Sequence, residues 1–218
     1  MAEFIKTRED LNIHHLLKLK KAHNISFEEF FKSCAKDIMN NICISNGAYL
    51  YHPIEIEFYI YDKNEHADIH VYPRDNQKAG DIFFHLSGMD ICFDSSITNG
   101  YFGGILIRAL ERENINKPDE KPRQQFGGPL TCKDEVLNTA IRKCCVDTCN
   151  DQRCNLNPDT RKRKGLENKG ENDEFFNAAY RFFREDIKFG KYIYMKDETF
   201  NFIDKIKVPR KRSHKIED

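Results

Sequence analysis

Tryptophan is absent from this chain of 218 residues, and neither sign of charge is in excess. Lys and Arg together number 35, as do Asp and Glu, which excludes a strongly basic protein that binds nucleic acid by bulk charge alone. No apolar run approaches the length of about 18 residues that a membrane-spanning helix needs. The opening MAEFIKTRED has no apolar stretch of the kind found in secretory signals. We therefore expect a cytoplasmic protein without a membrane partner.

In place of tryptophan the chain has 17 Phe and 9 Tyr within a hydrophobic fraction of 39%, enough for the aromatic core of one domain. Eight cysteines in a chain with no predicted signal are expected to be thiols rather than disulfides. Cys34, Cys43 and Cys92 lie within apolar patterns and are interpreted as small core residues.

The clearest local pattern predicts a helix over residues 27–42. Ser26 and Glu29 form an S-x-x-E capping box, in which each side chain can satisfy an exposed N–H at the helix start. The apolar positions of this helix recur at spacings of three and four and would face a core; they are Phe27, Phe30, Phe31, Cys34, Ile38 and Met39. Two further helices are predicted over 131–145, capped by Thr131, and over 172–187.

The segment YHPIEIEFYIYD alternates apolar with other residues, which is typical of a half-buried strand. Ile54, Ile56 and Phe58 would face the core. Glu57 and Tyr59 would then share the opposite face.

An arginine in a later apolar strand points to a partner for this glutamate. A hairpin is predicted to turn at Ser87-Gly88, and GGILIRALE follows as an apolar strand with one charge, Arg108. A buried unpaired charge is very costly, so Arg108 and Glu57 are predicted to meet. Two interpretations stay open, a plain salt bridge or a carboxylate that an arginine positions to activate water.

These elements predict a single α+β domain, built on a mixed, mainly antiparallel sheet with flanking helices. The chain is predicted to divide into five parts: an N-terminal arm or marginal helix (1–25), a core (26–143), a Cys-rich and basic insertion loop (144–171), a helix and strand that complete the core (172–204), and a basic tail (205–218).

The order of these motifs resembles the alkyladenine (3-methyladenine) DNA glycosylase family. The motifs that carry the resemblance are IEIEFY at 54–59, SGM at 87–89, LIRALE at 106–111 and GPL at 128–130, within residues 27–140. LIRALE is the most specific of them, and the others support it by their order.

The resemblance implies an enzyme without a cofactor that cleaves the N-glycosidic bond of a damaged, alkylated or deaminated purine in DNA, as in base-excision repair. Such enzymes flip the nucleotide out of the stack, because the sugar C1′ cannot be reached inside the duplex. Glu57 would activate water and Arg108 would orient it. The side chains that would line the base pocket are Tyr59, His70, Phe84 and Asp94, with His66 and Asp68 as alternatives to His70.

The chain departs from the family pattern at the hairpin tip and in the pocket. Ser87 stands where the family has a tyrosine that wedges into the duplex, with Met89 close by. Asp94 replaces an asparagine, and a carboxylate there would repel phosphate. Without the wedge, we expect activity on single strands or poorly paired lesions. We also expect the protein to be a monomer. The alternative is a non-catalytic relative on the same fold that binds nucleic acid or a small ligand.

Two other signals have alternative interpretations. The thiols of Cys144, Cys145, Cys149 and Cys154, with Cys132 upstream, could bind zinc in an interaction module or form an exposed thiol-rich loop. The basic runs RKRK at 161–164 and PRKRSHK in the tail could reach phosphates, although such runs are usually solvated.

Overall fold

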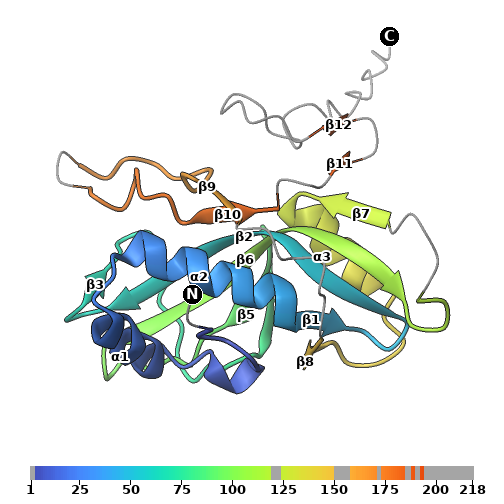
Figure 1. Cartoon of the computed structure of the whole chain (residues 1–218), viewed down its shortest axis with the longest axis horizontal. Helices are drawn as coiled ribbons and strands as arrows, with labels where there is room; N and C mark the ends of the chain where they lie inside the picture. The colour runs from blue at the N-terminus through green and yellow to red at the C-terminus, as the bar shows by residue number, and fades with distance from the viewer. Residues whose placement is uncertain are drawn as a thin grey trace, which may run out of the picture.

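Two strands of 14 residues each, β2 (Tyr49–Asp62) and β6 (Tyr101–Asn114), pair antiparallel along their lengths and form the centre of the fold. The computed structural model describes residues 3–118, 124–149, 158–170 and 173–184, with two short strands at 188–189 and 192–193. Within this part the chain forms one body, in which three α-helices pack on a curled antiparallel sheet (Figure 1).

The other described elements follow in chain order: η1 (Arg8–Asp10), α1 (Ile13–His23), α2 (Phe27–Asn41), β1 (Ile42–Ser45), β3 (His66–Ala67), β4 (Ile82–His85), β5 (Gly88–Cys92), β7 (Gln124–Gly127), α3 (Pro129–Asn138), β8 (Cys145–Thr148), β9 (Asp159–Arg161), β10 (Arg181–Phe183), β11 (Lys188–Phe189) and β12 (Tyr192–Ile193).

The main sheet runs β4-β5-β6-β2-β1-β8. The second edge of β2 pairs with three strands, β1, β10 and β3, at successive positions. A register irregularity at Pro53 separates the part of β2 that pairs with β1 from the part that pairs with β10. Proline suits this position because it cannot donate a ladder hydrogen bond.

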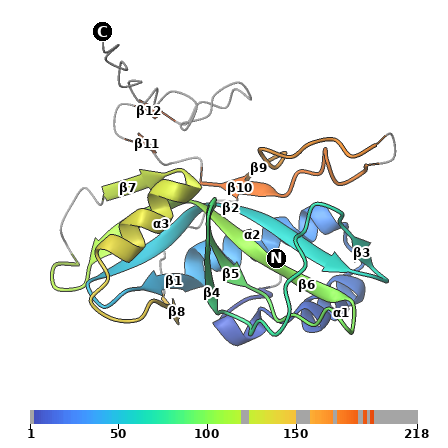
Figure 2. The same ribbon diagram turned by 180° about the vertical axis from the view of Figure 1, so that it is seen from behind.

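Helices cover both faces of this sheet, as the front and back views agree (Figures 1 and 2). The predicted capping box is confirmed, since Ser26 and Glu29 bond to each other's backbone N–H groups at the start of α2. α1 and α2 lie on one face, and α3 lies on the other against β5, β6 and β7. Residues 1–25 contribute to the core, because Ile13 and Leu16 of α1 are buried.

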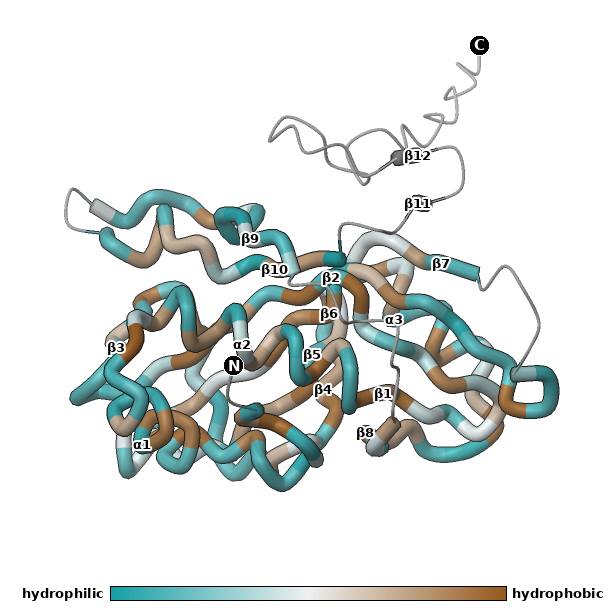
Figure 3. The backbone as a smooth tube through the Cα atoms, in the orientation of Figure 1, coloured by the Kyte–Doolittle hydropathy of each residue, from teal (hydrophilic) through white to brown (hydrophobic). Residues whose placement is uncertain are grey.

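The hydrophobic core lies between α1, α2 and the sheet. Apolar residues follow β2, β5 and β6, while β7 and β9 are mainly polar (Figure 3). Phe31 of α2 stacks on Phe58 of β2, with ring centroids 4.9 Å apart. Phe182 of β10 meets the same Phe58 edge-on, so the C-terminal part of the chain also contributes to this core.

The helix predicted over 172–187 is wrong for the residues described there. Residues 173–184 contain turns and then β10, whose strand residues pair with Glu55, Ile56 and Glu57 of β2. The backbone groups on this stretch of β2 would otherwise lack partners, and satisfying them outweighs a helical apolar spacing.

The second predicted helix is displaced. α3 begins after Gly128 with Pro129 in its first turn, and ends at Asn138, so Thr131 lies inside it and Cys145 belongs to β8. Proline is favoured in the first helical turn, where its missing N–H costs nothing. None of the described helices is long and apolar enough to span a bilayer.

Asp37 of α2 fixes the N-terminal segment and should make stability depend on pH. Its Oδ2 accepts the backbone N–H groups of Phe4 at 2.6 Å and Ile5 at 3.1 Å. Burial is the main cause that raises the pKa of Asp37 to about 6. A folded-state pKa above the unfolded value means that the native state binds the proton more tightly, so stability from this group falls as pH rises from about 4 to about 6.

We therefore expect the free energy of unfolding of the wild type, relative to Asp37→Asn, to decrease between about pH 4 and pH 6. Urea titrations of both proteins across this range measure the difference. Parallel pH profiles would show that Asp37 titrates normally.

Candidate active site

Glu57 and Arg108 meet on the face of the sheet opposite α2. This contact confirms the prediction that the two charged side chains pair. Arg108 Nη1 lies 3.2 Å from Glu57 Oε1. The Glu57 side chain is 0% exposed and that of Arg108 is 5% exposed, so the pair is removed from bulk water. The prediction of a half-buried strand is wrong here, because both faces of β2 are buried around Glu57, where the backbone of Lys164 contacts its carboxylate.

Two further donors hold the Glu57 carboxylate. The Tyr59 hydroxyl donates to Oε2 at 2.9 Å, and the backbone N–H of Lys164 donates to Oε1 at 2.9 Å. Burial, and next the charge of Glu57, raise the pKa of Tyr59, which therefore remains a protonated donor. With Arg108, three donors converge on Glu57.

A second carboxylate extends this cluster along β2. Glu55 Oε1 accepts from Arg108 Nε at 3.1 Å and from Arg181 Nε at 2.7 Å. Arg108 therefore contacts both Glu55 and Glu57. Arg181 comes from β10 and is directly opposite Glu57 in the strand register. We call these residues, with Tyr59, the carboxylate cluster.

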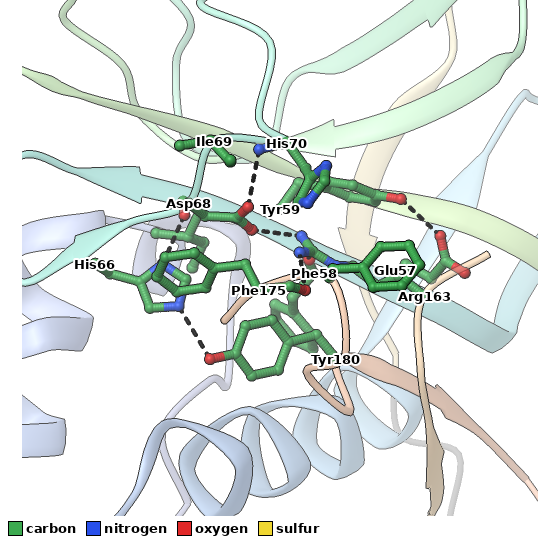
Figure 4. A network of polar contacts seen from close by, with 12 residues as sticks. Glu57, Phe58, Tyr59, His66, Asp68, Ile69, His70, Arg163, Phe175 and Tyr180 are labelled. Atoms are coloured by element: carbon green, nitrogen blue, oxygen red, sulfur yellow. Dashed lines mark hydrogen bonds and ion pairs between the residues drawn. The ribbon is translucent and has the colours of Figure 1, made fainter. Parts of the chain in front are cut away.

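Arg163, from the RKRK run, lies beside Tyr59 of the cluster (Figure 4). Its side chain and that of Asp68 are both 0% exposed and form an ion pair. Its guanidinium also donates to the carbonyl oxygens of Phe58 at 3.3 Å and Phe175 at 2.9 Å, and lies 4.7 Å from the Tyr59 ring centroid. The interpretation of this run as solvated is therefore wrong at Arg163.

The three candidates for the pocket histidine position are joined to one another through the backbone, but their side chains contact different residues. Asp68 accepts the backbone N–H of His70 at 3.0 Å and the guanidinium of Arg163. The ring of His70 contacts Asp173 at 2.9 Å. Of the three candidates, Asp68 is the one connected to Tyr59 through Arg163 (Figure 4).

His66 is buried, and both of its ring nitrogens have partners. Burial is the main cause that lowers its pKa. Neutral His66 can donate from Nδ1 to the Ile60 carbonyl at 2.8 Å and accept at Nε2 from the Tyr180 hydroxyl at 3.1 Å. These contacts make His66 part of the packing beneath residues 173–184.

Phe84 lies on the core side of the sheet, away from Glu57. It pairs with Met89, and opposite residues in an antiparallel pair point to the same face. Met89 is 0% exposed in the core, whereas Asp90 pairs with Leu106 and so shares the Glu57 face. The placement of Phe84 in the same pocket as Glu57 is therefore wrong.

Phe83 is the aromatic residue of β4 on the Glu57 face. It pairs with Asp90, and the Arg74 guanidinium lies over its ring at 4.4 Å. Arg74 also pairs with Asp90, and His85 Nε2 lies 3.3 Å from the same carboxylate. Sequence reasoning missed these residues. Asp90 in β5 lies two strands from Glu57, and Phe83 and His85 in β4 lie three strands from it.

Asp94 and the hairpin tip also differ from their predicted roles. Asp94 accepts from Asn12 Nδ2 at 2.9 Å and from the N–H of Ile13 at 2.6 Å, so it anchors the start of α1. The hairpin turns at residues 86–87, because His85 pairs with Gly88. Leu86 is 95% exposed at this tip beside Ser87, whereas Met89 is buried and cannot reach DNA.

A hollow of about 520 Å³ opens between the start of α2, β3 and residues 174–180. Its lining combines aromatic and acidic side chains, including Phe27, Phe175, Tyr180, Glu28, Glu65 and Glu174. Glu57 and Arg108 are not among its lining residues. The hollow therefore does not open onto the carboxylate cluster, and its rim is acidic.

Cys144, Cys145 and Cys149 are partly exposed cysteines, and Cys154 lies outside the described residues. In the part of the chain that the structure describes, no group of three or more His, Cys, Asp or Glu side chains could hold a metal ion. The basic tail also lies outside the described residues.

Comparison of the chain with protein-family models, with curated proteins and with solved structures found no match.

Proposed function

We propose that this chain hydrolyses the N-glycosidic bond of a damaged purine in DNA, with Glu57 as the general base. The observation that carries the proposal is the Glu57–Arg108 contact at 3.2 Å, with the Tyr59 hydroxyl on the other carboxylate oxygen. Arg108 and Tyr59 hold the carboxylate in a fixed orientation, as a base that accepts a proton from water requires.

Access to Glu57 requires movement of residues 158–170, which we call the covering segment. The Lys164 N–H occupies Glu57 Oε1, where a water molecule would bind. Withdrawal of this segment frees a lone pair on Oε1 while Arg108 and Tyr59 continue to orient the carboxylate. The bound water then loses a proton to Glu57 as its oxygen attacks C1′, and the bond to the purine breaks.

The second candidate function is binding without catalysis. The chain would then be a non-catalytic relative that binds nucleic acid or a small ligand. It is favoured by the complete burial of Glu57 and by the three donors that engage it. In this case the carboxylate cluster stabilises the fold, and the acidic hollow or another surface binds the ligand.

Base release distinguishes the two candidates. The substrates are duplex and single-stranded oligonucleotides that carry hypoxanthine, ethenoadenine or an alkylated purine, and released base is measured by chromatography. Release from any of them, faster on the single strand, supports the enzyme. Binding of these oligonucleotides without release of base would support the non-catalytic relative.

The hairpin tip should control activity on paired DNA. Filling the gap left by a flipped nucleotide offsets part of an unstacking cost of about a few kcal/mol. We expect Ser87→Tyr to increase the rate on a fully paired lesion several-fold and to change the single-strand rate little. Leu86→Ser, a change at the other exposed tip residue, should lower the duplex rate. Equal duplex rates in all three proteins would show that the tip does not approach DNA.

A further inference from the structure

Three side chains outside the carboxylate cluster contact one another in a row. They are the thiol of Cys149, just after β8, the imidazole of His52 in β2 and the carboxylate of Glu113 in β6. Cys149 Sγ lies 3.7 Å from His52 Nδ1. His52 Nε2 lies 2.8 Å from Glu113 Oε2. The His52 side chain is 4% exposed and that of Glu113 is 15% exposed, whereas Cys149 is partly exposed.

The strand register builds this row. Ile44 of β1 pairs with Tyr51, so the next residues along each strand, Cys43 and His52, come side by side. On the other edge of β1, Cys43 pairs with Asp147 of β8. The Cys149 N–H bonds to the Asn41 carbonyl at 2.7 Å, which continues this ladder and holds Cys149 beside Cys43.

The arrangement has the chemistry of an activated thiol. With the Nε2–H of His52 donated to Glu113, Nδ1 carries the lone pair that faces the Cys149 thiol. Transfer of the thiol proton to Nδ1 gives a thiolate, which is the nucleophilic form of cysteine, and an imidazolium that Glu113 stabilises. This is the nucleophile, base and orienting-group relation of a hydrolytic triad.

Cys43 supplies a second thiol next to the first. It is 1% exposed, and a hydrogen bond with Cys149 is the main cause that raises its pKa, followed by burial. Because Cys43 is buried and Cys149 is partly exposed, Cys149 is the thiol that a disulfide reaches first. A reactive, accessible thiol beside a buried protonated one is the usual pairing of an attacking and a resolving cysteine.

We propose that Cys149 and Cys43 form a thiol–disulfide exchange site for low-molecular-weight disulfides. The Cys149 thiolate attacks one sulfur of the disulfide RSSR, which breaks the S–S bond and releases RS⁻. The RS⁻ takes the proton from the His52 imidazolium. Cys43 then loses its proton to His52 and attacks Cys149 in the mixed disulfide, releasing the second RS⁻ as RSH. The protein gains one disulfide, and RSSR is reduced to two RSH.

The proposal is tested on the full chain with a chromogenic aromatic disulfide and with oxidised glutathione. All proteins carry Cys154→Ser, because Cys154 lies outside the described residues. We expect the fastest phase to release two thiols per chain from the aromatic disulfide. Cys149→Ser should abolish this phase, whereas Cys43→Ser should release one thiol and leave a mixed disulfide that intact mass measures.

His52→Gln tests activation and Cys144→Ser provides the matched control, since Cys144 is another partly exposed thiol of the same region. We expect His52→Gln to lower the rate constant of the fastest phase at neutral pH by about 10-fold or more and to make it rise with pH. Glu113→Gln should produce a smaller decrease, and Cys144→Ser should leave the phase unchanged.

Loss of the fastest phase in Cys144→Ser but not in Cys149→Ser would overturn the proposal. So would a His52→Gln protein that is folded by circular dichroism and reacts at the wild-type rate. Oxidised glutathione should give the Cys43–Cys149 disulfide, seen by peptide mapping, and a stable adduct on Cys149 in wild type would disprove the resolving role of Cys43.

Discussion

Glu57→Gln will reduce the rate of base release by about 10²–10⁴-fold if Glu57 activates water, because an amide cannot accept the proton. The side chain keeps its size, and its amide oxygen can still accept a hydrogen bond from Arg108 or Tyr59. Single-turnover release from a single-stranded substrate measures the effect without a contribution from product dissociation.

Glu55→Gln is the matched control for this prediction. Glu55 is two residues away on the same strand, is similarly buried, and contacts the same Arg108. We expect Glu55→Gln to retain much more activity than Glu57→Gln in protein that is folded at the assay temperature. Equal losses in the two variants would assign Glu57 to the stability of the cluster rather than to catalysis.

Arg163→Met will destabilise the protein by about 3–5 kcal/mol, because it leaves the buried carboxylate of Asp68 without its charge partner. Both side chains of the pair are 0% exposed, so water cannot replace the lost contact without a change in structure. The free energy of unfolding from urea titration measures the loss.

The pairing is tested by adding Asp68→Asn to Arg163→Met. We expect the double variant to be more stable than the sum of the single effects allows, because no uncompensated charge remains. Lys162→Met removes a positive charge from an exposed position in the same run and should change stability by about 0.5 kcal/mol or less. Additive effects of the two substitutions would show that the pair is not coupled.

Burial of a charge is the sequence argument that located the candidate site. An arginine within an apolar strand and a glutamate within an alternating one each needed a partner, and Arg108 contacts Glu57. The glycosylase-like form of the fold remains a prediction, whereas the mixed α/β architecture with a curled antiparallel sheet is confirmed.

The rest of the site depended on contacts that local patterns do not encode. Arg163 stands in a run of four basic residues, where nothing distinguishes the buried side chain from the solvated ones. Phe83 and Phe84 are adjacent and both aromatic, so alternation could not decide which one faces the core. The apolar spacing within 172–187 fits a helix as well as a strand. The pairing of β10 with β2 decides between the two, and the local pattern does not encode it.

The covering of Glu57 also has a consequence for the order of folding. The Lys164 N–H reaches Glu57 across 107 positions of the chain, and Arg181 reaches Glu55 across 126. Contacts between distant positions form slowly, because the intervening loop must close first. During synthesis, β2 and β6 can pair before Arg163 and Arg181 leave the ribosome. The nascent sheet then has two carboxylates with Arg108 as their cationic partner, and a stretch of unpaired edge on β2 that β10 later closes.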